Sequence, residues 1–149
     1  MQGLLINGEL VTTEKTLDVI NPATEQVFTT VPRANESDLE QAIAAAKVAA
    51  ALWGLTEQKA RQELLISIAD SIHENIAELA KILTQEQGKP LEAATMEVQY
   101  AEAFCRYFAA QSLSPEVLEE DETKRVEIHH KPVGVVAGIV PWNFPFLII

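Results

Sequence analysis

Residues 133–140 constrain the fold of this chain more than any other stretch. They are apolar, rich in β-branched side chains and uncharged, and they include two glycines. Such a continuous apolar run predicts a strand that is buried on both faces, as the parallel sheets of α/β proteins require. The strand is expected to end at the turn Pro-Trp-Asn-Phe-Pro, residues 141–145. Functional groups of open α/β sheets gather at the carboxyl ends of strands, which is where Asn143 lies.

Asn143 is the one polar side chain of this turn, and its amide could act as a catalytic hydrogen-bond donor. A fixed donor that faces an oxygen gaining negative charge can stabilise a transition state by roughly 3 kcal/mol. The alternative is an asparagine that bonds its own backbone within a turn bounded by prolines. The residues themselves leave both interpretations open.

The N-terminal part of the chain predicts β structure. Asn7-Gly8 lies between two short apolar runs, and both residues tolerate positive φ, which favours a β-hairpin. Asn21-Pro22 marks a turn, and residues 27–31 read as a further strand ended by Pro32. We expect this part to wrap the edge of a larger unit.

Amphipathic helices follow, because apolar residues recur at spacings of three and four. The first is expected to begin with a capping box of Ser37 and Glu40 and to end at Gly54. The second begins after Thr56 and ends at Gly88, and a kink or break is expected within residues 73–75. The third begins at Lys89-Pro90 and carries the apolar stripe Leu91, Ala94, Val98, Ala101, Cys105 and Phe108.

Composition limits the partners and the compartment. The chain has 11 basic and 22 acidic residues, a net charge of -11, which argues against nucleic acid or an anionic membrane as a partner. No signal peptide or membrane span is evident, and the single cysteine forms no intrachain disulfide. We therefore expect a cytoplasmic protein. Cys105 falls on an apolar helical stripe, so we interpret it as a structural residue and not as a nucleophile.

No metal site is expected. Five carboxylates crowd into residues 116–122, but they lack the alternating ligands and glycine of a calcium loop, so we interpret them as a solvated linker. Residues 125–130 alternate in polarity as a half-exposed strand does. Because His129 and His130 are adjacent, a strand would point them to opposite faces, and they would not chelate one metal ion.

The turn at residues 141–145 also resembles a segment of the aldehyde dehydrogenase superfamily, the NAD(P)-dependent oxidisers of aldehydes to acids. Further segments resemble that family in the same order: residues 6–9, 20–25, 38–51, 88–91 and 132–135. A colinear set that spans the whole chain is far more specific than one pentapeptide.

The resemblance implies an α/β fold, the N-terminal portion of a Rossmann-type cofactor domain, mainly helical here, with an oligomerisation-arm strand and the first strand of a parallel sheet. Residues 1–113 would be the N-terminal part of the cofactor-binding domain, residues 114–131 a linker and arm strand, and residues 132–149 the first core strand and the turn. The family forms homo-oligomers, so a dimer or tetramer is expected.

The resemblance also implies site residues. Asn143 matches the asparagine that stabilises the oxyanion, and the positions matching the lining of the NAD or NADP site are Ile139, Val140, Pro141, Trp142 and Asn143. The family's nucleophilic cysteine and general-base glutamate lie downstream of this turn, so we expect the 149-residue chain alone to be inactive. Two alternatives stay open: a non-catalytic binding or assembly module, and a CoA-acylating or semialdehyde-specific member of the family.

Overall fold

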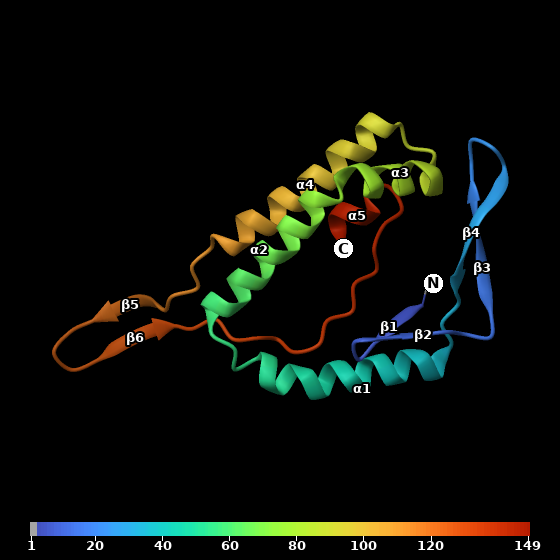
Figure 1. The fold of residues 1–149 in the computed structure, drawn as a ribbon. Coiled ribbons are helices and arrows are strands. Elements are labelled where there is room, and N and C mark those ends of the chain that lie inside the picture. The colour runs from blue at the N-terminus through green and yellow to red at the C-terminus, as the bar shows by residue number, and fades with distance from the viewer. Residues whose placement is uncertain (1–2) are drawn as a thin grey trace.

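A computed structural model describes residues 3–149, so the first two residues of the expected domain at 1–113 lie outside the described part. Helices dominate, accompanied by three separate two-stranded antiparallel sheets (Figure 1). The mixed helix and strand content agrees with the predicted class. In residues 3–149, no helix is long and apolar enough to cross a membrane.

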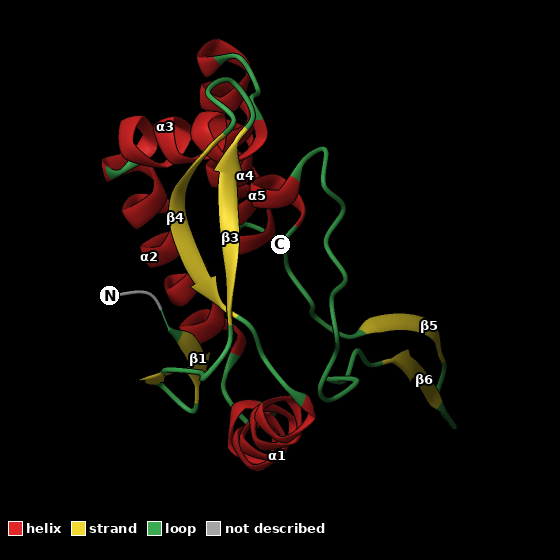
Figure 2. Cartoon of the chain, turned by 90° about the vertical axis from the view of Figure 1, so that its right-hand side faces the viewer, coloured by secondary structure: helices red, strands yellow, loops and turns green. Residues whose placement is uncertain are grey.

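Three helices form the packed centre of the molecule: α2 (Gln58–Glu74), α3 (Ile76–Gln87) and α4 (Leu91–Ala109). Figure 2 shows them behind the long β-hairpin. Ala69, Ala80 and Ala94 are fully buried, and such small side chains let neighbouring helices approach closely. Val98 is the largest apolar side chain that is fully buried, and burying a valine contributes about 1.5–3 kcal/mol. The core cluster is Ala80, Leu83, Ala94 and Val98, with Ile72, Ile76, Leu79 and Phe146 packed against it.

The helix boundaries agree well with the sequence patterns. The break expected within residues 73–75 is present, because α2 ends and α3 begins at Asn75. The helix α3 ends at Gly88, whose φ of 74° lies in the left-handed region that favours glycine.

The start of α1 (Glu36–Trp53) differs from the prediction. The capping box consists of Asn35 and Asp38, each of which bonds the other's backbone N–H, and not of Ser37 and Glu40. The N-cap lies two residues earlier than expected, at Asn35, whose backbone is extended. None of the α1 residues is buried: the helix contacts β1, but Leu39, Ile43 and Trp53 of its apolar stripe stay exposed.

Two β-hairpins precede the helices. Strands β1 (Leu4–Ile6) and β2 (Glu9–Val11) pair around Asn7-Gly8, whose φ angles are 52° and 81°, as predicted. The expected strand at residues 27–31 is β4 (Gln26–Pro32), and it pairs with β3 (Thr16–Asn21), which the sequence patterns do not predict.

The segment predicted as an acidic linker contains a strand. Strand β5 (Glu116–Glu120) pairs with β6 (Arg125–Ile128), and the hairpin projects from the helices as an arm (Figure 1). Lys124 and Arg125 bond Glu119 and Glu120, which offsets the repulsion among the carboxylates. The linker interpretation was therefore wrong for residues 116–120, whereas the strand expected from residue 125 is present.

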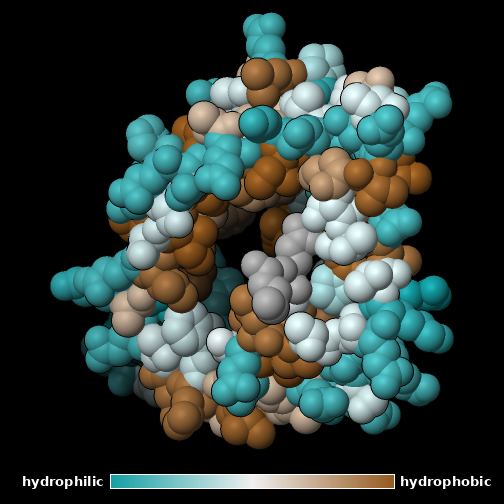
Figure 3. Space-filling view, turned by 45° about the vertical axis from the view of Figure 1, so that its right-hand side comes forward, coloured by the Kyte–Doolittle hydropathy of each residue, from teal (hydrophilic) through white to brown (hydrophobic). Residues whose placement is uncertain are grey.

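The strand expected at residues 133–140 is absent from this chain's secondary structure. These residues follow an irregular path from β6 to the short helix α5 (Pro145–Ile148) (Figure 1). A strand requires a neighbour that supplies inter-strand hydrogen bonds, and none of the described segments pairs with residues 133–140. Val133, Val136 and Ile139 are consequently exposed. Figure 3 shows much hydrophobic surface around a hollow on one face of the molecule.

Candidate functional site

The turn that contains Asn143 lies where α3, α4 and α5 meet. Gly88 ends α3 in the left-handed conformation, and Pro90 then precedes the first residue of α4. This sharp connection places Lys89 between the two helices and next to the turn at residues 142–144. Phe146 of α5 packs into the core cluster, which anchors the far side of the turn.

Glu97 of α4 is 1% exposed, and it lies on the same stripe as Ala94, Val98 and Ala101. Its Oε1 accepts hydrogen bonds from the backbone N–H groups of Phe146 (2.9 Å) and Leu147 (3.3 Å). These N–H groups belong to the first turn of α5 and have no partner within a helix. The carboxylate of Glu97 therefore caps α5 from another helix.

Lys89 compensates the buried charge of Glu97, because its ammonium forms an ion pair with Oε2. The same ammonium donates to the backbone carbonyl of Asn143 at 2.7 Å. It also lies over the Phe144 ring, 4.5 Å from the centroid, in a cation–π arrangement. The carbonyl of Trp142, the residue before Asn143, accepts a hydrogen bond from the Gln87 side chain. The backbone from residue 142 to residue 147 is thus bonded at both ends by side chains of α3, α4 and their connection.

The side-chain amide of Asn143 has a different environment from its backbone. Asn143 is exposed, and within residues 3–149 its side-chain amide has no hydrogen-bond partner. The turn's main chain is held by Lys89 and not by the Asn143 side chain, so the self-bonding alternative does not describe this structure. The arrangement leaves an amide donor available on a fixed stretch of backbone.

Three of the predicted cofactor-site residues lie together. Val140, Pro141 and Trp142 line a hollow of about 460 Å³ with Glu86, Gln87 and Pro145. Ile139, which is 99% exposed, and Asn143 are not among its lining residues. The lining offers apolar surface and one carboxylate but no cation. It fits the nicotinamide end of a dinucleotide, a flat ring that is positively charged in the oxidised form, and it provides nothing that would neutralise the pyrophosphate.

Cys105 lies apart from this turn. It is half-buried on α4, eight residues beyond Glu97, which corresponds to roughly 12 Å along the helix axis. In the described part of the chain, no group of three or more His, Cys, Asp or Glu residues could hold a metal ion. The strand expected over residues 125–130 ends at Ile128, and His129, just beyond it, bonds Glu127 at 2.8 Å.

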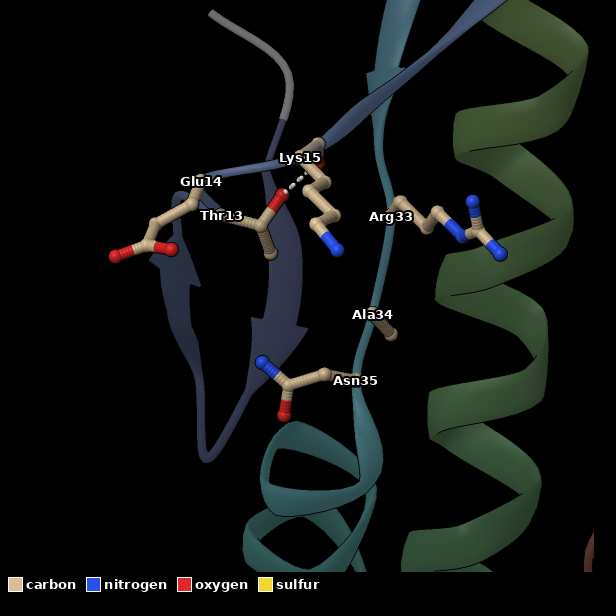
Figure 4. Close-up of a pocket in the computed structure, with 6 residues that line it drawn as sticks. All are labelled: Thr13, Glu14, Lys15, Arg33, Ala34 and Asn35. Atoms are coloured by element: carbon tan, nitrogen blue, oxygen red, sulfur yellow. Dashed lines mark hydrogen bonds between the residues drawn. The ribbon is translucent and has the colours of Figure 1, made fainter.

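A second hollow, of about 440 Å³, lies between the N-terminal hairpins and α1 (Figure 4). Its lining residues are Thr13, Glu14, Lys15, Arg33, Ala34 and Asn35. The Arg33 side chain points away from the hollow, and the Asn35 oxygen already caps α1. Because its polar groups do not converge, we assign no function to it.

The sequence patterns predict no role for Gln87, Lys89 or Glu97. One signal was available for Glu97: a charged residue on an apolar helical stripe is rarely fully buried unless it is paired. Helix periodicity could not predict the partners of Glu97, because Lys89 precedes the helix and the residues of α5 lie about fifty positions away.

The pronounced pKa shifts lie away from this site. The carboxyl pKa of Glu102 is lowered, first by its hydrogen bond with His73 and then by that with Arg106. The guanidinium pKa of Arg106 is raised by hydrogen bonds to Glu102 and then Asp70. In the arm, Arg125 and then His129 lower the carboxyl pKa of Glu127. These groups tie α2 to α4 and stiffen the β5–β6 hairpin.

Comparison with known proteins covers nearly the whole chain. The profile of the Aldehyde dehydrogenase family matches residues 10–149. A probable aldehyde dehydrogenase of a Pseudomonas species is 42% identical over 142 residues, which are 95% of this chain and 29% of that protein. The chain thus spans less than a third of the length of this relative.

Solved structures show the same relationship. Succinate-semialdehyde dehydrogenase from Burkholderia pseudomallei has a TM-score of 0.91 and 36% identity, covering 99% of this chain and 32% of that one. Betaine aldehyde dehydrogenase from Staphylococcus aureus, in complex with NAD+, has a TM-score of 0.90 and 32% identity, covering 99% and 31%.

Proposed function

The chain belongs to the aldehyde dehydrogenase family, and from this premise we propose that it forms part of an enzyme that oxidises an aldehyde to a carboxylic acid with NAD(P)+. The proposal is supported by the side-chain amide of Asn143, which has no hydrogen-bond partner within residues 3–149 and projects from a backbone that Lys89 and Gln87 bond. An amide donor in this position suits the oxygen that becomes negatively charged when a nucleophile adds to a carbonyl.

In the proposed reaction a cysteine thiolate, which this chain does not supply, adds to the aldehyde carbon. The π electrons of the carbonyl move to its oxygen, and the Asn143 amide donates a hydrogen bond to that oxygen. After hydride loss the acyl group is held as a thioester, and a glutamate from outside this chain activates the water that releases the acid. Residues 1–149 alone are therefore expected to be inactive.

NAD(P)+, when bound, accepts the hydride. Val140, Pro141 and Trp142 would contact the flat nicotinamide ring, because they supply apolar surface beside Asn143. The carboxylate of Glu86 in the same lining disfavours a phosphate there. We propose that Ile139 also contributes to the cofactor site, because it directly precedes Val140, the first residue of this segment that lines the hollow.

We also propose the assembly implied by the family. Residues 1–113 and 132–149 belong to the cofactor-binding domain, whereas residues 114–131 form an arm that pairs with another copy in a cytoplasmic dimer or tetramer. The projection of the β5–β6 hairpin away from the helices supports this role (Figure 1). An exposed two-stranded hairpin gains stability by packing against a further surface.

The test measures aldehyde-dependent reduction of NAD+ and NADP+ by the whole enzyme that contains this chain, followed through the absorbance of the reduced nicotinamide. Turnover is expected with the whole enzyme and not with residues 1–149 alone. A whole enzyme that reduces neither cofactor across a panel of aliphatic, aromatic and semialdehyde substrates would contradict the proposal. Turnover by the isolated chain would show that its nucleophile lies within these residues.

A further inference from the structure

Two charged side chains hold the chain at Asn143 and in the residues that follow it. Lys89 donates to the Asn143 carbonyl at 2.7 Å and covers the Phe144 ring, and Glu97 accepts the N–H groups of Phe146 and Leu147. Lys89 and Glu97 are also bonded to each other. We call these two residues the clasp. Its contacts reach four of the six residues between 142 and 147, and none of them involves the side-chain amide of Asn143.

The clasp is built into the interior. Glu97 is 1% exposed and the Lys89 side chain is only 16% exposed, so water competes weakly for their hydrogen bonds. The carboxylate uses both oxygens, and the ammonium meets a carboxylate, a carbonyl and a ring face. A charged pair in this setting fixes geometry, whereas a well-packed apolar pair of similar volume would provide comparable stability.

Catalysis by a hydrogen-bond donor depends on its direction, because a donor displaced by about 1 Å can cost a rate factor of about 100. The amide of Asn143 turns only about its own side-chain bonds once its backbone is fixed. The two prolines of the turn restrict φ at residues 141 and 145, but they leave residues 142–144 without such a restriction. Within the clasp, Lys89 acts on this unrestricted part, and Glu97 fixes the first turn of α5 that follows it.

We propose that Lys89 and Glu97 are positioning residues for the Asn143 amide: they set the backbone from which the oxyanion donor projects. The inference rests on the proposed function of Asn143. We expect the clasp to affect kcat without changing how tightly the substrate binds. Neither residue needs to touch the substrate or the cofactor.

The decisive variant removes the clasp without leaving a buried charge. In the whole enzyme, the double variant Lys89→Met/Glu97→Gln keeps the side-chain volumes and removes both charges, so a folded protein is expected. Its kcat should fall roughly 10- to 100-fold, with KM for the aldehyde changing much less. The matched control is Glu102→Gln/Arg106→Met, which removes an ion pair of the same helix that does not contact residues 142–147; its kcat should equal that of the wild type.

A cycle with Asn143→Ala separates positioning from general damage. If the clasp acts through Asn143, adding Lys89→Met/Glu97→Gln to Asn143→Ala lowers kcat little further, because the donor to be positioned is already gone. If the fold-losses in kcat of Asn143→Ala and of Lys89→Met/Glu97→Gln instead multiply in the combined variant, the positioning role is overturned. An unchanged kcat in Lys89→Met/Glu97→Gln, when the wild-type enzyme is active, would also overturn it. Hydrogen exchange at the N–H groups of Phe146 and Leu147 should accelerate in Lys89→Met/Glu97→Met, which removes the acceptor oxygens, and unchanged exchange would also overturn it. An inactive wild-type enzyme would instead contradict the proposed function and, with it, any catalytic meaning of the clasp.

Discussion

The Oε1 atom of Glu97 accepts the backbone N–H of Phe146 at 2.9 Å, although 49 positions separate the two residues in the chain. This bond connects the middle of the longest helix to the segment that follows Asn143. Because Glu97 is buried and also binds Lys89, its loss affects several groups at once.

Replacing Glu97 by alanine is therefore expected to destabilise the protein strongly. The change leaves the Lys89 ammonium without its counterion and frees two N–H groups of α5. Breaking a buried pair in this way costs about 3–5 kcal/mol of unfolding free energy, measured by urea denaturation. The control is Glu63→Ala, which removes an exposed ion pair with Lys59 and should cost about 0–1 kcal/mol. Equal effects of the two substitutions would be inconsistent with a buried Glu97.

Gly88→Ala should also destabilise the protein. An added Cβ would lie 2.7 Å from Cγ of Pro22, and the residue has a φ of 74°. The left-handed conformation alone costs a side-chain-bearing residue about 1–2 kcal/mol. The matched control is Gly138→Ala, where a Cβ would meet nothing within 4 Å and φ is not left-handed. Thermal melting compares the two; a Gly88→Ala melting temperature equal to that of the control would argue against this tight approach.

Acid should weaken the connection between α2 and α4. The pKa of Glu102 is lowered in the folded protein by His73 and then by Arg106, so its contribution to stability is complete above the ordinary glutamate pKa of about 4.3. That contribution disappears as the pH falls through the lowered value, because the protonated carboxyl loses its preference for the folded state. Unfolding free energies measured between about pH 6 and pH 3 should fall less steeply for Glu102→Gln than for the wild type. Parallel curves would contradict the assignment.

Features determined by neighbours in sequence were predictable, and features determined by distant partners were not. Asn7-Gly8 specifies its hairpin through its own φ preferences, and Gly88 ends α3 for the same reason. The strand expected at residues 133–140 depends on a partner strand, which the described residues do not provide. The capping box forms at Asn35 and not at the predicted Ser37, because asparagine is an equally favoured N-cap residue and the Asp38 side chain reaches its backbone N–H.

The candidate site divides in the same way. Asn143 could be singled out as a candidate because a single amide stands between aromatic residues in a proline-bounded turn, whereas its proposed oxyanion role came from the family resemblance. Lys89 and Glu97 could not be assigned to it, because their connection to the turn exists only after α4 packs beside α5. The hollow lined by Val140, Pro141 and Trp142 likewise requires Glu86 and Gln87 from the end of α3.

If the Asn143 amide stabilises a developing oxyanion, as we propose, its removal should show in kcat of the whole enzyme carrying Asn143→Ala. Removal of one such donor lowers kcat by about 100- to 1,000-fold. The folded fraction should stay unchanged, because the side-chain amide bonds nothing within residues 3–149. We predict a loss of that size with an unaltered melting temperature. A variant that turns over aldehyde at the wild-type rate would contradict the account.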